Sequence, residues 1–324
     1  MKAFVTGISG FVGSHLAEHL LAAGDEVLGA ARTGDRLQHV PTGVATTAWD
    51  ISRDPPAGEL LDAVRRFEPD VIYHLAAMSI PRDCGTAEPT AEARALNVDG
   101  VSRVLELAEE LPRSPRVVFT SSSHVYAVDS RQPVVPETAP LAPRNAYGRT
   151  KFEAESLCLA AASGGADVVI VRSFSQAGPR QDPRLMLAEW ARQLLSDTPS
   201  ISVGNLHVGV DLRDVRDAVR ALRALALNGV AGDVYNVGSA ISRTTGSWFE
   251  LLRHTAGDRR PVNERDVKPR NDPIADTSKL RSLTGWRPTV LPEQTVADIW
   301  SYWRDVVDGE ASSRQRASQQ QQQQ

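Results

Sequence analysis

The chain has 324 residues, of which 41% are hydrophobic and 23% charged, enough for one large α/β domain with an appendage or for two modest domains. The formal net charge of -4 gives no electrostatic reason to expect nucleic acid or an anionic membrane as a partner. No apolar run is long enough to span a bilayer, and the first residues lack the regions of a signal peptide. The two cysteines have no metal-ligand spacing, so we expect a cytoplasmic protein in a reducing compartment, without a metal site.

The first element is a short strand over 2–6, followed by the turn GISGFVG and by a helix over 11–22 with apolar residues at helical spacing. Glycines let the backbone turn tightly and approach a pyrophosphate, which then lies at the positive N-terminus of the helix. The spacing is GxxGxxG rather than the best-known GxGxxG, and an ordinary strand-to-helix turn is the alternative. The flanking strand and helix favour a dinucleotide site. Its expected residues are Gly7, Gly10, Phe11, Val12 and Gly13.

The end of the second strand, over 26–31, bears on which nicotinamide cofactor fits. An acidic residue there binds the ribose hydroxyls of NAD, whereas a nearby arginine accommodates the 2′-phosphate of NADP. The chain has Arg32 at this point, Arg36 shortly after it, and no acid at the strand end. We therefore expect NADP(H) to be favoured over NAD(H). The alternative is that Arg32 is a solvated surface residue.

Two more strands are expected over 45–50 and 71–75, with a helix over 60–67 between them. The end of the first of these strands is expected beside the adenine, and the small residues after the second allow a cofactor to pass closely. His74 lies in an apolar run and is expected in or near the core. The expected cofactor contacts here are Asp50, Ile51, Leu75, Ala76 and Ala77.

A long helix over 93–111 and a fifth strand over 116–120 follow, and the strand leads into three serines at 121–123. Strands and helices that alternate this regularly predict an α/β fold with a doubly wound parallel sheet of the Rossmann type. Ligands of such sheets lie at the carboxyl ends of the strands. The residues expected at these ends include Gly10, Arg32, Asp50, Ala76 and Ser122.

Tyr147 and Lys151 are four residues apart in the segment APRNAYGRTK, so a helix there places both side chains on one face. A free tyrosine titrates near ~10, and we expect the cationic Lys151 to lower the pKa of Tyr147 toward a useful range. Ser122 is then placed to hold the oxygen that gains or loses the proton. The YxxxK pattern alone also fits a surface tyrosine and lysine, but the strand and serines before it favour chemistry.

Several segments in combination resemble the extended short-chain dehydrogenase/reductase superfamily, in its nucleotide-sugar branch, the NAD-dependent epimerase/dehydratase family. They are GISGFVG, YHLAA, NVDG at 97–100, TSSSHVY and YGRTK. Later segments agree, namely VVIVRSFSQAGPRQ, GDVYNVGS and DTSKLRSLTGWRPT, so the resemblance extends from residue 1 to about residue 303. Within this branch, VRSFSQAGPRQ, SVGNL and DVRDAVRAL are most similar to reductases of GDP-4-keto-6-deoxy-mannose.

The resemblance implies that Ser122 is the catalytic Ser/Thr, Tyr147 the acid-base tyrosine and Lys151 the ribose-binding lysine. It also implies a nucleotide-sugar substrate in a smaller C-terminal lobe. A homodimer is implied through the helices over 93–111 and 147–162, which carry extra apolar residues such as Val101, Val104, Leu105, Leu157 and Leu159. The residues expected to bind substrate are Ser79, Ser123, His124, Ser175, Arg213 and Arg270.

Three positions depart from the family pattern. His124 stands where the dehydratases of the branch carry an acid, so we expect no dehydratase activity. Ser175 replaces an asparagine, and Val210 replaces an arginine that often binds the nucleotide phosphate. Either another cation binds the phosphate or the substrate is not a standard nucleotide sugar. The candidate cations are Arg213, Lys268 and Arg270.

We expect a dinucleotide-binding domain over 1–174, with 213–237 returning to it, and a substrate lobe over 175–212 and 238–308. Residues 309–324 are rich in glutamine and have too little apolar surface to fold, so a disordered tail is expected.

Three functions compete. The first is a reductase, in which hydride passes from NADPH to a sugar 4-keto carbon and Tyr147 protonates the oxygen. The second is a 4-epimerase that oxidises and re-reduces one carbon with a tightly held cofactor, and the third is a non-catalytic NADP-binding sensor. The complete set of Ser122, Tyr147 and Lys151 argues against the sensor. Arg32 indicates an exchangeable NADP and therefore favours the reductase.

Overall fold

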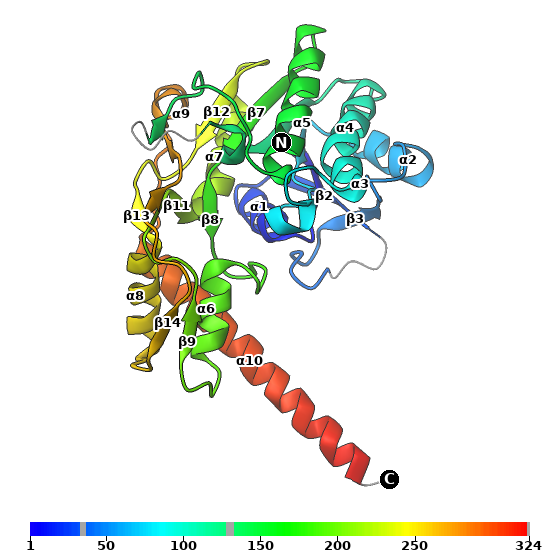
Figure 1. Cartoon of the computed structure of the whole chain (residues 1–324). Helices are drawn as coiled ribbons and strands as arrows, with labels where there is room; N and C mark the ends of the chain where they lie inside the picture. Colours follow the sequence, from blue (N-terminus) through cyan, green and yellow to red (C-terminus); the bar gives the residue numbers. More distant parts are fainter. Residues whose placement is uncertain (33–36, 128–132, 323–324) are drawn as a thin grey trace.

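The computed structural model describes residues 1–32, 37–127 and 133–322, and a seven-stranded parallel sheet lies at its centre (Figure 1). Its strands are β1 (Lys2–Thr6), β2 (Glu26–Ala31), β3 (Ala45–Ala48), β4 (Val71–His74), β5 (Arg116–Ser122), β7 (Val168–Ser173) and β12 (Val234–Val237). Across the sheet they run β3-β2-β1-β4-β5-β7-β12, so the chain winds outward from β1 in both directions. The predicted doubly wound parallel sheet is confirmed. Arg36 lies outside the described residues.

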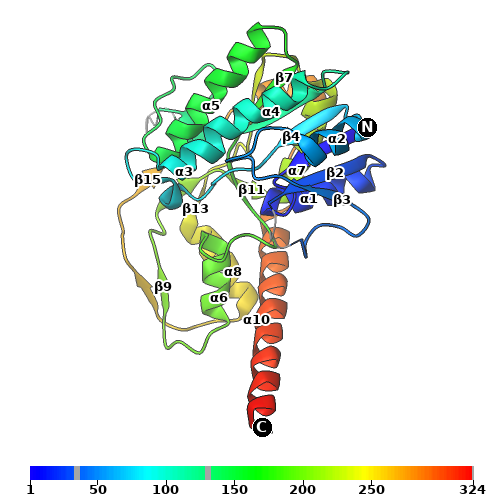
Figure 2. The ribbon, with the colours of Figure 1, turned by 90° about the vertical axis from the view of Figure 1, so that its right-hand side faces the viewer.

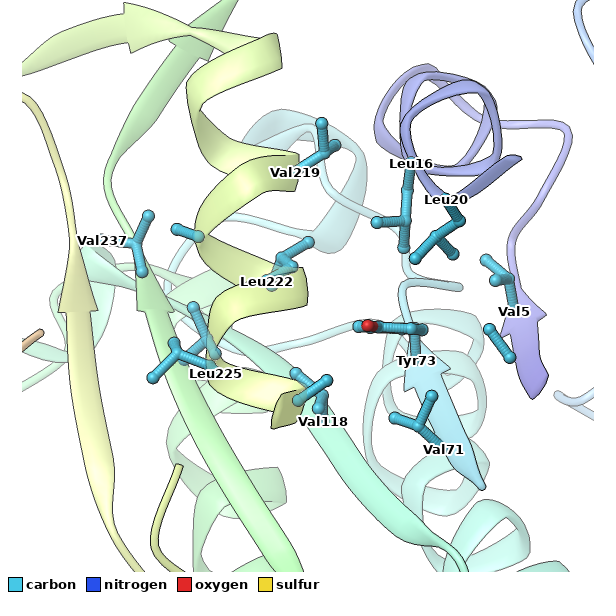
Figure 3. Packing of buried hydrophobic residues seen from close by; sticks show 14 of the residues in the cluster. Val5, Leu16, Leu20, Val71, Tyr73, Val118, Val219, Leu222, Leu225 and Val237 are labelled. Carbon is cyan, nitrogen blue, oxygen red and sulfur yellow. The ribbon is translucent and has the colours of Figure 1, made fainter. Parts of the chain in front are cut away.

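Helices cover both faces of this sheet, which explains why its strands read as near-continuous apolar runs. These helices are α1 (Phe11–Ala22), α2 (Gly58–Phe67), α3 (Ala91–Arg94), α4 (Gly100–Glu109), α5 (Ala146–Ser163) and α7 (Val215–Asn228). On one face α1 and α7 pack against β1, β4 and β5, and α2, α4 and α5 pack on the other (Figure 2). Figure 3 shows Leu16 and Leu20 of α1 and Leu222 of α7 pointing into the space around Tyr73.

The helix predicted over 93–111 is interrupted by a π-helical turn at Ala95–Asp99. Within this turn the Asn97 side chain binds a loop that follows β4: its Oδ1 accepts from the Met78 backbone N–H at 2.8 Å, and its Nδ2 donates to the Met78 carbonyl at 3.0 Å. Nδ2 also lies 3.0 Å from Thr150 Oγ1 on α5. Because such turns accommodate one extra residue in a helix, Asn97 can join the loop to α5.

A second core lies beside the sheet, where α6, α8 and α10 pack Trp190, Trp248, Phe249 and Trp303 together. The remaining helices are α6 (Met186–Leu194), α8 (Thr245–Ala256), α9 (Ser278–Thr284) and α10 (Pro292–Gln322). The short strands are β6 (Val134–Val135), β8 (Ser175–Ala177), β9 (Ile201–Val203), β10 (Val208–Val210), β11 (Leu212–Asp214), β13 (Arg243–Thr244), β14 (Val262–Glu264), β15 (Arg270–Asn271) and β16 (Ile274–Ala275). They form a sheet β13-β10-β15 and the pairs β11-β8, β14-β9 and β16-β6. The expected residue boundaries between the two lobes stay a prediction.

The helices α4 and α5 carry the apolar residues that we expected in a dimer interface. Val101 and Val104 of α4 are buried against the sheet of the same chain, so they cannot form that interface. Leu105 of α4 is half-buried and packs against the same core. On α5, Phe152 and Leu159 remain 38% and 39% exposed.

Helix α10 begins at Pro292 and ends at Gln322, and its last turns project away from the rest of the molecule (Figures 1 and 2). The structure thus differs from the disordered tail expected over 309–324. Glutamine, arginine and alanine are favourable in helices, so a helix that has already formed can continue through such residues. Among the helices that the structure describes, α10 included, none combines the length and hydrophobicity needed to cross a membrane.

Candidate active site

The turn between β1 and α1 brings the backbone so close to the end of β4 that only glycine fits. Gly7 has a φ of 71°, and a Cβ on it would lie 2.8 Å from the backbone nitrogen of Ala76. A Cβ on Gly13 would lie 2.1 Å from the carbonyl oxygen of Gly7. Gly10 is the N-cap residue of α1 and has no side chain with which to cap the helix. Its backbone N–H groups can therefore face an anion such as a pyrophosphate, so the turn fits a dinucleotide.

A cavity of ≈ 570 Å³ opens at the carboxyl ends of β1, β2, β4 and β5, beside this turn. It brings together most of the residues that the sequence predicts for the site. Those that line it are Gly7, Gly10, Phe11, Val12, Gly13, Arg32, Ile51, Leu75, Ala76, Ala77, Ser79, Ser122, Ser123, His124, Tyr147, Lys151 and Ser175. Strand β8 adds Gln176 and the segment after it adds Gln181 and Leu185, which were not among the site residues expected from the sequence.

Asp50 lies just outside this lining, and its carboxylate is bound to Ser52. It accepts from the Ser52 hydroxyl at 2.6 Å and from the Ser52 N–H at 3.1 Å, and these bonds hold the pKa of Asp50 below its usual range. The charges of Arg53 and Arg32 act in the same direction. An ionised carboxylate therefore lies near Arg32, although no acid occupies the end of β2 itself.

Two arginines expected to bind substrate do not line the cavity. Arg213 is buried on β11, where its guanidinium donates to the Phe174 carbonyl at 3.0 Å and to Ser173 Oγ at 2.8 Å. It therefore supports the cavity wall from behind. Arg270 is exposed on β15, 3.8 Å from Asp272. Their positions give no support to a direct role in substrate binding, because the β-strands that carry them direct the guanidinium groups elsewhere.

Tyr147 lies in the first turn of α5, buried against the cavity wall. Burial raises the pKa of Tyr147 to about 12, while the nearby Ser122 hydroxyl favours the phenolate and acts in the opposite direction. Ser122 is itself buried at the end of β5. The phenol therefore carries its proton at neutral pH.

Lys151 lies one turn further along α5, as the spacing predicts, but its charge is directed elsewhere. Its Nζ donates to the carbonyl of Thr120 at 2.9 Å and lies 5.1 Å from the centre of the Phe119 ring. Burial lowers the pKa of Lys151 to about 8. The expectation that Lys151 lowers the pKa of Tyr147 is wrong for this structure, because burial of the phenol dominates and the ammonium is bound to the backbone of β5.

Three polar residues support this site. Asn97 and Thr150 join the start of α5 to the loop after β4, and Thr150 also donates to the Tyr147 carbonyl at 2.8 Å. The Cys84 thiol donates to the Met78 carbonyl at 3.2 Å, and burial raises the pKa of Cys84 to about 11, so it stays neutral. The signal that could have identified Asn97 is a polar residue on the apolar face of a predicted helix.

His74 is confirmed as a core residue. It is buried at the end of β4, and its Nδ1 lies 2.8 Å from Thr6 Oγ1. Burial, aided by the charge of Lys151, lowers the pKa of His74 to about 3, so the ring is neutral.

Comparisons with known proteins agree with this geometry. The sequence matches the NAD dependent epimerase/dehydratase family over residues 3–238. The GDP-6-deoxy-D-mannose reductase of Pseudomonas aeruginosa is 29% identical over 318 residues, which cover 94% of this chain and 98% of the relative. The solved structure of RMD from Pseudomonas aeruginosa, complexed with NADPH, has a TM-score of 0.77 at 27% identity and covers 94% of this chain and 99% of its own.

A second solved structure is UDP-glucuronic acid 4-epimerase from Bacillus cereus, in complex with UDP-glucuronic acid and NAD. It has a TM-score of 0.81 at 26% identity, over 94% of this chain and 100% of its own. The family match covers more than half of this chain and includes the glycine turn, the end of β5 and the start of α5. The chain therefore belongs to the NAD dependent epimerase/dehydratase family.

Proposed function

We propose that the protein uses NADPH to reduce a nucleotide-linked 4-keto-6-deoxy sugar, with Tyr147 as the proton donor. The observation that carries the proposal is that Ser122, Tyr147 and Lys151 line the same cavity as the glycine turn and Arg32. The similarity to GDP-6-deoxy-D-mannose reductase, and to a structure complexed with NADPH, supports both the substrate class and the cofactor. A GDP-linked sugar, a homodimer and a cytoplasmic location belong to the same proposal.

The residues of the chain divide the binding of the cofactor among them. The glycine turn accepts the pyrophosphate at the N-terminus of α1, and Arg32 pairs with the 2′-phosphate. Lys151, held by Thr120, binds the ribose hydroxyls with the remaining donors of its ammonium group. When bound, NADPH supplies the hydride for the keto carbon.

The protonation state of Tyr147 suits the direction of this reaction. Reduction places negative charge on the former carbonyl oxygen, which Ser122 stabilises by a hydrogen bond while Tyr147 delivers the proton. Since the pKa of Tyr147 is raised to about 12, the side chain begins as an acid. An oxidation would need it to begin as a base.

A 4-epimerase with tightly held cofactor is the second candidate, and the similarity to UDP-glucuronic acid 4-epimerase favours it. The two candidates differ in cofactor exchange, because a reductase consumes free NADPH whereas an epimerase regenerates its bound cofactor in each cycle.

The test is NADPH oxidation with 4-keto-6-deoxy hexoses linked to GDP, dTDP or UDP. We expect turnover with NADPH, lower turnover with NADH, and preference for the GDP-linked ketone. No NADPH oxidation with any of these ketones, together with interconversion of 4-hydroxy epimers by protein that retains its cofactor, would replace the reductase with the epimerase.

A further inference from the structure

Asn145 and His124 form a hydrogen-bonded pair at the edge of the cavity. Asn145 precedes α5, and its Oδ1 accepts the backbone N–H of Gly148 at 2.8 Å. Because a backbone N–H can only donate, the atom that receives it must be the amide oxygen. The other end of the amide, Nδ2, lies 2.8 Å from His124 Nδ1. The orientation of the Asn145 amide is therefore fixed by Gly148.

This orientation determines which nitrogen of His124 carries the proton. An amide NH₂ group can only donate, so His124 Nδ1 must accept, and the neutral ring carries its hydrogen on Nε2. The protein around His124 lowers its pKa by desolvation, against the opposing charge of Asp272 from the neighbouring lobe. Protonation at Nδ1 would also set two donors against each other. His124 is thus a neutral Nε2–H donor at neutral pH.

The position of His124 in the cavity is fixed from three sides. Its backbone N–H donates to Ser122 Oγ at 3.2 Å, and its ring meets the Tyr147 ring edge to face, with centres 5.5 Å apart. A Cβ on Gly148 would lie 2.4 Å from the His124 carbonyl oxygen, so the backbone at His124 is in close contact with the start of α5. His124 is exposed, and it is one of the residues that line the cavity.

We propose that the His124 Nε2–H donates a hydrogen bond to a sugar oxygen next to the carbonyl held by Tyr147 and Ser122, and that Asn145 is the positioning residue that sets this tautomer. The proposal rests on the proposed function. It adds that His124 selects among sugars by the oxygen on the carbon next to the keto carbon. Because Nε2 already carries a proton, His124 does not act as a base. The hydrogen on the carbon next to the ketone therefore stays in place.

The tautomer can be measured without substrate, by the ¹⁵N and ¹H shifts of the histidine rings, with His124→Gln assigning the signal. We expect an Nε2–H tautomer in the parent. Asn145→Asp keeps an oxygen for Gly148 N–H but presents a second oxygen to Nδ1, so a proton should appear on Nδ1. A parent ring that is doubly protonated or protonated on Nδ1 at neutral pH would overturn the proposal.

Kinetics with the 4-keto sugar then test the contact itself. The Gln side chain in His124→Gln keeps an N–H donor, whereas His124→Leu removes it, and a lost hydrogen bond of this kind corresponds to a rise in KM of roughly 3- to 10-fold. We expect this rise in His124→Leu, a smaller rise in His124→Gln, which retains a donor, and NADPH affinity within about twofold of the parent in both. His254→Gln, on the exposed face of α8, is the matched control.

Equal KM values for the parent and His124→Leu would refute the contact. Deuterium from D₂O incorporated next to the ketone by the parent, but not by His124→Leu, would show a base instead of a donor. Failure of the parent to oxidise NADPH would refute the proposed function. The shifts of the ring nitrogens need no substrate, so they test the His124 tautomer set by Asn145 independently of that function.

Discussion

The ammonium group of Lys151 donates a hydrogen bond to the carbonyl of Thr120, 2.9 Å away at the end of β5. This bond joins α5, which carries Tyr147, to β5, which carries Ser122. It therefore helps to fix the position of the helix relative to the strand. It also directs the lysine charge toward the strand rather than toward Tyr147. In the mechanism that we propose, Lys151 binds the cofactor and Tyr147 keeps its proton until the substrate arrives.

The first prediction concerns the pH dependence of cofactor binding. Burial lowers the pKa of Lys151 to about 8, so the side chain is charged below that pH and neutral above it. Affinity for NADPH should therefore fall as the pH rises through about 8. Lys151→Met should bind NADPH weakly at every pH and show no such step, as measured by fluorescence titration. Lys279→Met, on α9 and away from the cavity, is the control, and a step that persists in Lys151→Met would contradict the assignment.

Arg32 should determine the choice between the two nicotinamide cofactors. A charge-assisted contact with the 2′-phosphate corresponds to roughly 10- to 150-fold in affinity, so Arg32→Ala should weaken NADPH by that factor and leave NADH nearly unchanged. Arg53→Ala removes the same charge from a side chain that also lies near Asp50 and is mostly exposed, and it should change neither affinity. Isothermal titration checks both variants, and an equal loss of both cofactors in Arg32→Ala would show that the arginine has no phosphate partner.

The close approach of α1 to the turn makes Gly13 sensitive to a single methyl group. A Cβ there would lie 2.1 Å from the Gly7 carbonyl oxygen, so Gly13→Ala must displace the turn and should abolish NADPH binding. Overpacking of this kind typically costs about 1–3 kcal/mol of the free energy of unfolding. At Gly204 an added Cβ meets nothing within 4 Å, so Gly204→Ala is the control. Thermal unfolding with and without NADPH measures both effects, and normal binding by Gly13→Ala would show that the cofactor lies elsewhere.

A homodimer through α5 is the fourth prediction, and it rests on Phe152 and Leu159. Both side chains are more than a third exposed, whereas Ala154, Leu157 and Cys158 of the same helix pack against the core. Light scattering at micromolar concentration should give the mass of a dimer. Leu159→Glu should shift this mass toward that of a monomer, whereas Leu283→Glu, which is similarly exposed on α9, should not. A parent protein with the mass of a monomer would contradict the prediction.

The sheet was predictable because its strands are buried on both faces and therefore read as short apolar runs separated by helical patterns. The residues that line the cavity were predictable for a related reason, since the ends of parallel strands meet at one edge. Contacts between side chains that are distant in sequence could not be predicted in this way. The spacing of Tyr147 and Lys151 predicts a shared helix face, but it does not reveal that Thr120 accepts the ammonium bond.

The same reason explains why some side chains lie in other surroundings than the sequence led us to expect. Arg213 follows a family motif closely enough to be a candidate, yet its guanidinium is occupied by Phe174 and Ser173, which precede it by about forty residues. Val101 and Val104 have the helical spacing of an interface and are instead buried in the core of the same chain. Asn145 was not singled out at all, because its effect on His124 depends on the turn that brings the two residues together.

The central claim is that hydride passes from free NADPH to the 4-keto carbon while Tyr147 donates the proton. It is tested most directly with NADPH that carries deuterium at the transferred position, by mass spectrometry and NMR of the sugar product. The parent should place one deuterium at carbon 4, and Tyr147→Phe should bind NADPH normally but turn over roughly 10²- to 10⁴-fold more slowly, the usual contribution of general acid catalysis. An unlabelled carbon 4, or full activity of Tyr147→Phe beside an active parent, would contradict the account.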